Sequence, residues 1–136
     1  MTSLILPPTR NTPSIWFEPN AGRFEMSGIS VPENASEFYQ PVYDWLDGIL
    51  PHIVEGQLFR FQLSYFNSTS LKAIFLLLKR IVDNGVLGPK AVIHWCVEED
   101  DEFMIESAEM YMELLNTRFE VEYVPIDQQL GDRIAS

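Results

Sequence analysis

The sequence predicts an α/β (α+β) protein made of two layers, a mixed sheet with helices mainly on one face. Alternating apolar runs and runs with helical apolar spacing follow one another as strand, strand, helix, strand, helix, strand, helix, strand. The last three strands, joined by crossover helices, should be parallel neighbours. Polar residues such as Arg60 and Gln62 occupy alternate strand positions, so the second sheet face should stay at least partly open. This pattern argues against a three-layer nucleotide-binding fold.

The first predicted elements form a β-hairpin. Short alternating runs at residues 14–18 and 23–27 flank a Pro-Asn-Ala-Gly sequence, which is typical of a turn. Residues 28–32 are expected to be a connector.

A first helix should follow, because Asn34 and Glu37 have the spacing of a capping box. Pro41 within it either kinks the helix or marks a later start. The predicted inward stripe is Phe38, Val42, Trp45, Leu46 and Ile49.

The remaining chain alternates strands and helices. We expect strands at residues 57–66, 91–97 and 120–124, and helices at 68–84 and 103–115. In the first of these strands the inward residues should be Phe59, Phe61, Leu63 and Tyr65. In the first of these helices they should be Leu71, Ile74, Phe75, Leu78, Ile81 and Val82. The last helix should turn Met104, Ala108, Tyr111 and Leu115 inward and Glu102, Glu106, Glu109 and Glu113 outward. Gly85 is a plausible C-terminal stop for the middle helix.

Length and composition favour a single globular domain over residues 1–136, with a core at about 12–125 and a loose tail at 126–136. Apolar residues make up 46% of the chain, yet the longest apolar stretch is far too short to span a bilayer. The first residues do not resemble a signal peptide. Cys96 is the single cysteine, which excludes an intramolecular disulfide and suits the reducing cytoplasm.

The net charge of −11 disfavours binding to nucleic acid or to an anionic membrane surface. Half of the acidic residues lie between Glu98 and Glu122. The run at residues 98–102 is interpreted as a solvated loop with acids at a helix N-terminus. A docking patch for a basic partner is the alternative.

Few residues carry recognisable catalytic or metal-binding chemistry. The glycines form no phosphate-binding loop, and no cofactor is predicted. His94 and Cys96 are two positions apart on a predicted strand and so share one face. Two ligands are too few for zinc without an acid from elsewhere, so no metal site is predicted and both residues are assigned core or interface roles. A small enzyme using this pair, or acids in a cleft, stays open as an alternative.

The strand-to-helix junction Asn67 to Ser70 crowds an amide and three hydroxyls at one helix start. In the simplest interpretation Asn67 or Ser68 caps the helix. In the functional interpretation a hydroxyl is phosphorylated, which the positive end of the helix dipole would tolerate. Helical geometry turns Thr69 outward and places Ser68 and Ser70 at the two flanks of the apolar stripe. A partner surface would include Asn67, Ser70, Lys72, Ala73 and Leu76.

The chain resembles the SiaC family of bacterial regulatory phosphoproteins from about Thr12 to Pro125. The resemblance rests on Thr12-Pro13 with the hairpin from Phe17 to Gly22, the Gly-Ile-Ser-Val-Pro-Glu-Asn sequence from Gly28, Glu-Phe-Tyr from Glu37, and Tyr-Phe-Asn-Ser-Thr-Ser from Tyr65. The pairs Trp45-Leu46 and His94-Trp95 complete it.

This resemblance implies a STAS-like, anti-sigma-factor-antagonist-like switch that is not an enzyme. It implies a cognate kinase that phosphorylates the hydroxyl after the motif asparagine and a PP2C-type phosphatase that removes the phosphate. The unphosphorylated form would bind a partner such as a diguanylate cyclase, which controls cyclic-di-GMP and biofilm formation. By position the phosphosite is Ser68. The family pattern is commonly Asn-Thr-Ser-Ser and this chain has Asn-Ser-Thr-Ser, so Thr69 is the second candidate. A STAS-like scaffold without phosphorylation is a further alternative.

Overall fold

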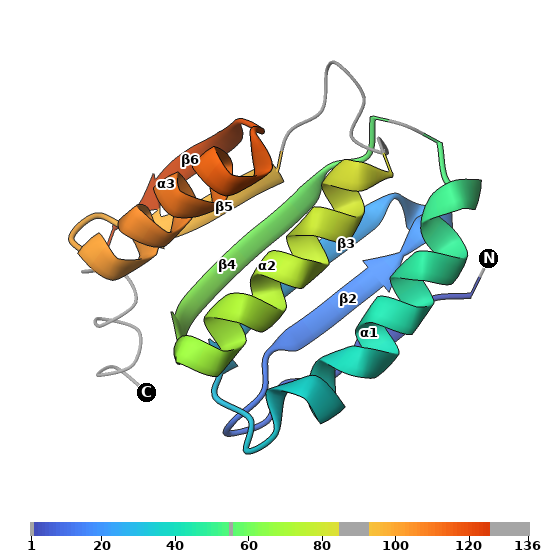
Figure 1. Cartoon of the computed structure of the whole chain (residues 1–136), viewed down its shortest axis with the longest axis horizontal. Coiled ribbons are helices and arrows are strands. Elements are labelled where there is room, and N and C mark those ends of the chain that lie inside the picture. The colour runs from blue at the N-terminus through green and yellow to red at the C-terminus, as the bar shows by residue number, and fades with distance from the viewer. Residues whose placement is uncertain (1, 55, 85–92, 126–136) are drawn as a thin grey trace.

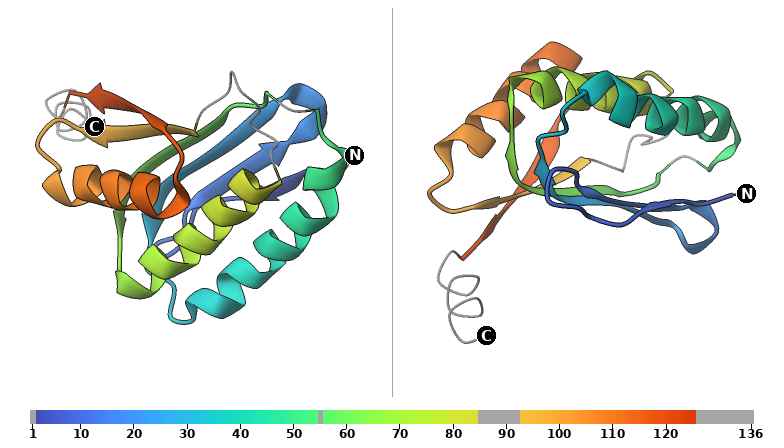
Figure 2. Two further views of the ribbon diagram at one scale, coloured as in Figure 1. Left: turned by 45° about the horizontal axis from the view of Figure 1, so that its top comes forward. Right: turned by 90° about the horizontal axis from the view of Figure 1, so that it is seen from below.

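The computed structural model describes residues 2–54, 56–84 and 93–125. Three helices lie on one face of a mixed sheet, and the other face carries no helix in this part of the chain (Figures 1 and 2). The α/β two-layer class predicted from the sequence is confirmed. The elements are β1 Leu4–Leu6, β2 Ser14–Glu18, a 3₁₀ turn Pro19–Ala21, β3 Arg23–Ser30, α1 Ala35–Ile49, a 3₁₀ turn Leu50–His52, β4 Phe59–Phe66, α2 Ser68–Asp83, β5 Ile93–Glu98, α3 Glu102–Leu115 and β6 Phe119–Val124.

The six strands lie in the order in which they occur in the chain. The first three are antiparallel neighbours, and β3 to β6 are parallel. The predicted hairpin and the parallel arrangement of the last three strands are therefore confirmed. Strand β1 was not predicted, because three residues are too few to display an alternating pattern. The parallel pairing of β3 with β4 was not predicted either.

Strand β3 is longer than predicted and contains an irregularity. The sequence had suggested a connector at residues 28–32, but residues 28–30 belong to the strand. Gly28 has φ +103°, which glycine adopts without strain, and the register with β4 shifts between Gly28 and Ile29. Across this shift the next β4 residue to pair after Leu63 is Tyr65. The alternation of β4 is thereby inverted: Phe66 is buried and Tyr65 is 51% exposed, which corrects the expected inward position of Tyr65.

Helix α1 begins where its capping box predicts. The Asn34 side chain accepts a hydrogen bond from the Glu37 backbone N–H at 3.1 Å. Pro41 lies inside the helix, so of the two alternatives given for it the later start is excluded. Its buried residues are Tyr39, Val42, Tyr43 and Leu46, whereas Phe38, Trp45 and Ile49 are only partly buried. The buried face therefore includes two tyrosines. The Tyr39 hydroxyl is hydrogen-bonded to Ser30, and the Tyr43 hydroxyl to the Ala73 carbonyl.

Helices α2 and α3 match their predicted ranges to within one residue. The buried face of α2 is Ser70, Ala73, Ile74, Leu77, Leu78 and Ile81, so the expected stripe is rotated. Leu71, Phe75 and Val82 are only partly buried, and Phe75 stacks on Tyr111 of α3 with ring centroids 6.4 Å apart. The four predicted outward glutamates of α3 are exposed. Gly85, residues 91–92 of the predicted strand and the predicted tail 126–136 lie outside the described residues.

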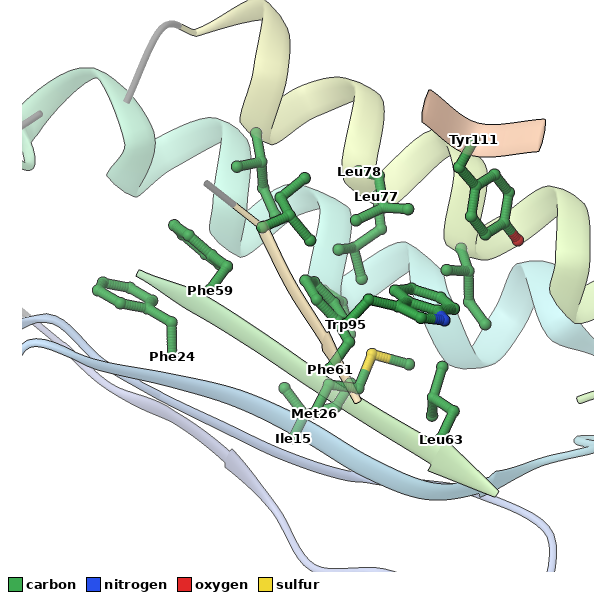
Figure 3. Close-up of a cluster of buried hydrophobic side chains, with 14 of the residues drawn as sticks. Ile15, Phe24, Met26, Phe59, Phe61, Leu63, Leu77, Leu78, Trp95 and Tyr111 are labelled. Carbon is green, nitrogen blue, oxygen red and sulfur yellow. The ribbon is translucent and has the colours of Figure 1, made fainter. Parts of the chain in front are cut away.

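The core fills the space between the helices and the covered sheet face (Figure 3). Phe24 and Phe59 stack at 4.4 Å on neighbouring strands. Trp95 lies against Phe61, Tyr111 and Phe119 at centroid distances of 5.7 to 5.8 Å. Burying large aromatic side chains, together with the aliphatic residues of the core, drives the packing of the two layers. Within the described residues no helix is long and apolar enough to cross a membrane.

Candidate functional site

The N-terminus of α2 is capped by Asn67. Its Oδ1 accepts a hydrogen bond from the Ser70 backbone N–H at 3.0 Å, with backbone angles of φ −86° and ψ 179°. Its own N–H donates to the Ser30 carbonyl at 3.3 Å, and its carbonyl accepts from Leu71. The simplest interpretation of the junction, an N-cap, is therefore confirmed for Asn67. The cap also ties the start of α2 to the end of β3.

The hydroxyls of Ser68 and Thr69 differ in their surroundings, although both residues are exposed. The Thr69 Oγ1 donates to Asn67 Oδ1 at 3.0 Å, so it shares the oxygen that caps the helix. The Ser68 hydroxyl makes no hydrogen bond to any described residue. Of the two candidate phosphosites, Thr69 is thus the one whose hydroxyl bonds to the capping oxygen.

Ser70 lies in the protein interior and not at the surface. It is 0% exposed, and its Oγ accepts a hydrogen bond from the Ser30 hydroxyl at 2.9 Å. Since Ser30 donates to Ser70, it accepts from the Tyr39 hydroxyl, 2.6 Å away. Burial raises the pKa of Tyr39. Ser70 therefore positions the helix start and offers no surface to a partner, contrary to its predicted role.

A groove runs between α1 and α2 and opens beside the candidate phosphosites. Its volume is about 620 Å³. Five of the predicted site residues line it together: Ser68, Thr69, Lys72, Ala73 and Leu76. The Tyr43 hydroxyl donates to the Ala73 carbonyl at 2.7 Å, and Arg80 lies over the Tyr43 ring and bonds Asp47 at 3.1 Å. These contacts fasten the two helices to each other.

The other wall of the groove comes from the start of α1, and the sequence analysis did not assign it to the site. Its residues are Glu33, Asn34, Ala35, Ser36, Gln40 and Tyr43. Both helices follow the carboxyl ends of the parallel neighbours β3 and β4, so their N-termini emerge at the same sheet edge. Recognising that pairing from the sequence would have located this wall.

The strand β6 brings Glu122 to His94 and Cys96, which share the open face of β5 as predicted. Glu122 Oε2 lies 3.1 Å from His94 Nε2 and 3.4 Å from Cys96 Sγ. Arg60 on β4 completes this polar cluster with an ion pair to Glu122 at 3.2 Å. Burial chiefly raises the pKa of the Cys96 thiol to about 11, so the thiol is protonated at neutral pH, unlike an activated nucleophile. The hydrogen bond from Cys96, together with Arg60, lowers the pKa of Glu122.

The acidic run at residues 98–102 also adopts its simpler predicted role. Glu99 and Asp100 are exposed in a turn, and Asp101 caps α3 by accepting from the Met104 N–H at 3.1 Å.

Comparison with known proteins places the chain among regulatory phosphoproteins. The family model described as SiaC family regulatory phosphoprotein matches residues 6–124. An uncharacterised protein of Pseudomonas aeruginosa (strain UCBPP-PA14) is 31% identical over 113 residues, which cover 83% of this chain and 90% of that protein.

Solved structures of SiaC from the same organism share the fold. The crystal structure of apo-SiaC from Pseudomonas aeruginosa is similar with a TM-score of 0.76 and 30% identity, covering 90% of this chain and 99% of that chain. A chain in the crystal structure of the diguanylate cyclase SiaD in complex with its activator SiaC gives a TM-score of 0.78 and 29% identity, covering 89% of this chain and 99% of its own. The family match over most of the length and the shared fold lead to one conclusion: the chain belongs to the SiaC family of regulatory phosphoproteins.

Proposed function

We propose that this chain is a phosphorylation-controlled binding protein in a partner-switching circuit. Its unphosphorylated form binds and regulates a partner, and phosphate on Ser68 abolishes that binding. The observation that carries the proposal is the position of Ser68, exposed in the first turn of α2 and on the wall of the α1–α2 groove.

Ser68 is favoured over Thr69 by the hydrogen bonds of the cap. A phosphate adds about 1.5 to 2 negative charges, which the positive end of a helix dipole stabilises. On Ser68 this charge leaves the bonds of Asn67 intact. On Thr69 it would replace the proton donated to Asn67 Oδ1 and put negative charge against the capping oxygen. Thr69 is the second candidate.

The chemistry of the groove explains how a phosphate would act on a partner. Leu76 and Ala73 supply apolar surface there, and Lys72 supplies a positive charge. A partner segment that fills the groove displaces water, and a doubly charged group at its rim resists that desolvation. The fold tolerates the modification, so its effect falls on the complex.

The relatives suggest the members of the circuit. SiaC of Pseudomonas aeruginosa is the activator of the diguanylate cyclase SiaD, and we propose a diguanylate cyclase as the partner of this chain. A cognate protein kinase adds the phosphate and a PP2C-type phosphatase removes it, both in the cytoplasm. In this scheme the chain acts by binding and not as an enzyme.

The phosphosite is tested by incubating the purified chain with its cognate kinase and ATP and mapping phosphopeptides by mass spectrometry. We expect phosphate on Ser68, its loss in Ser68→Ala and its retention in Thr69→Ala. Phosphate on neither residue would overturn the proposal.

Partner control is tested by measuring binding to the diguanylate cyclase encoded in the same genome, together with cyclic-di-GMP formation. Ser68→Asp and Leu76→Asp should abolish binding, whereas Leu114→Asp adds the same charge at an exposed α3 position outside the groove and should not. Cys96→Ser and His94→Ala should leave regulation intact. Loss of regulation in these two variants, with Ser68→Asp unaffected, would favour the enzyme alternative.

A further inference from the structure

Three chemically different metal-ligand groups meet on the helix-free face of the sheet. His94 and Cys96 lie on β5, and Glu122 lies opposite Cys96 on the parallel neighbour β6. Their donor atoms, an imidazole nitrogen of His94, Cys96 Sγ and a Glu122 carboxylate oxygen, all lie within 4.8 Å of one another. In a tetrahedral zinc site with bonds near 2.0 to 2.3 Å, ligand atoms are about 3.5 Å apart. The unliganded separations of 3.1 and 3.4 Å to Glu122 are thus already close to those of a metal site.

We propose that His94, Cys96 and Glu122 bind a divalent metal ion of borderline softness, of which Zn²⁺ is the best match. Thiolate and imidazole ligands select this class of metal over Mg²⁺ and Ca²⁺, which prefer oxygen. Three protein ligands leave the fourth tetrahedral position to water. Binding forms a metal–sulfur bond as the Cys96 thiol releases its proton to solvent, with no change of oxidation state. The site does not depend on the function proposed for Ser68.

Two of the three ligand residues lie at solvent-accessible space. The Glu122 side chain is 44% exposed. Cys96 is itself buried, yet it is one of the residues that line a cleft of about 270 Å³, together with Gln62, Ser64 and Glu98. The cleft lies where β4 and β5 diverge, because their pairing among the described residues ends at Phe61 and Trp95.

In the unliganded protein Arg60 occupies the Glu122 carboxylate that the metal would bind. Its Nη1 lies 3.2 Å from Glu122 Oε2 and 3.4 Å from His94 Nδ1, so it neutralises the acid in the unliganded protein. The Arg60 side chain is 36% exposed, and an ion pair between two partly exposed groups is weak. A metal ion can therefore displace the guanidinium toward solvent. His94 directs Nε2 to Glu122 and Nδ1 to Arg60, so Nε2 is the ligand atom. The proton on Nε2 moves to Nδ1 when the Arg60 guanidinium leaves, and the metal takes the freed Nε2 lone pair.

The test is a Co²⁺ titration of the full chain followed by optical absorption, with Zn²⁺ as the displacing ion. We expect a thiolate-to-cobalt charge-transfer band that Zn²⁺ removes and that Cys96→Ser abolishes. His94→Gln and Glu122→Gln should each weaken binding by about tenfold or more, since even changes behind the ligands cost about 10- to 100-fold. The control is His52→Gln. His52 is the other histidine of the chain, is exposed and lies outside the cluster, so this variant should leave binding unchanged.

The variant Arg60→Gln distinguishes binding at this site from nonspecific metal binding by other surface groups. Removing the competing charge should tighten Co²⁺ and Zn²⁺ binding. Absence of the charge-transfer band, an equal affinity in Cys96→Ser, or weaker binding in Arg60→Gln would each overturn the proposal. Ser68→Asp should leave metal affinity unchanged, so failure of the phosphorylation proposal and failure of the metal site can be told apart.

Discussion

The N-termini of α2 and α3 are capped in the same way but carry opposite electrostatics. In each, a side-chain oxygen accepts from the backbone N–H three residues on, at 3.0 Å from Asn67 and 3.1 Å from Asp101. The α3 cap is a carboxylate followed by Glu102, whereas the first turn of α2 has no acidic residue. Of the three helices in the described part of the chain, only α2 lacks an acid in its first turn.

The negative charge at the start of α3 is permanent, whereas any negative charge at the start of α2 depends on modification. Negative charge near a helix N-terminus is stabilising, and α3 has it by sequence. At α2 the same position holds neutral hydroxyls, so negative charge arrives there only by modification. Although the net charge is −11, the first turn of α2 contains no acidic residue, and this is the helix end where we propose the switch.

The largest expected effect comes from the buried hydroxyls behind the α2 cap. Ser30→Ala leaves the Tyr39 hydroxyl without its acceptor and Ser70 without its donor, which should cost about 1 to 3 kcal/mol of unfolding free energy. Urea denaturation followed by circular dichroism measures it. The control is Ser107→Ala in α3, where the lost hydroxyl only donates to the Phe103 carbonyl four residues earlier, and it should cost less. Equal losses would mean that the α2 start has no special support.

Alkaline pH should reveal the burial of Tyr39 behind the α2 cap in the unmutated protein. Burial raises the pKa of Tyr39 above the 10.0 of an unfolded tyrosine, so the unfolded chain loses this proton first. The stabilisation is complete below pH 10 and decreases as pH rises toward the native pKa, by about 1.4 kcal/mol per pH unit. Tyr39→Phe should reduce this alkaline decline in denaturation midpoints without abolishing it, because burial also raises the pKa of Tyr43 and Tyr111. An unchanged pH slope in that variant would contradict the assignment.

The two caps should be distinguishable by salt. Asn67→Ala and Asp101→Ala should each cost about 1 kcal/mol of unfolding free energy, the usual value for a lost N-cap. The Asp101 loss includes a charge–dipole contribution that salt screens, so it should shrink as salt increases. The Asn67 loss should not. Denaturation at low and high salt checks both, and identical salt responses would remove the proposed contrast.

The smallest expected change in unfolding free energy is that of Ser68→Asp, and its sign is what matters. Ser68→Asp should stabilise the fold by about 0.3 to 1 kcal/mol at low salt, because it supplies the charge that α2 lacks. Glu102→Gln should remove a similar amount from α3. Thermal unfolding measures both. A destabilised Ser68→Asp would mean that loss of partner binding in this variant reflects damage to the fold.

Much of the fold follows from local patterns in the sequence. The hairpin, the helices and the last strands are visible because each repeats its pattern over several residues. The position of Tyr65 and the extent of β3 were not predictable in this way, because a single strand does not reveal that its neighbour carries an irregularity at Gly28.

The sites show the same limit. The Asn67 cap is a local motif and could be recognised. The burial of Ser70 depends on Ser30 and Tyr39, which are 40 and 31 positions away and meet it only through the sheet and α1. Glu122 joins Cys96 through strand pairing across 26 positions. Residues far apart in the chain needed the register of the sheet before their contact could be known.

The divergence of β4 from β5 has a consequence for how the molecule opens. Beyond Phe61 and Trp95 the two strands part, so the second half of β5 has β6 but not β4 as a ladder neighbour (Figure 1). Few interstrand bonds there join the β1–β4 portion to the unit of β5, α3 and β6. Native proteins exchange amide hydrogens through subglobal openings along such weak joints. We expect this unit to exchange as a cooperative group of its own, ahead of β2, β3 and β4.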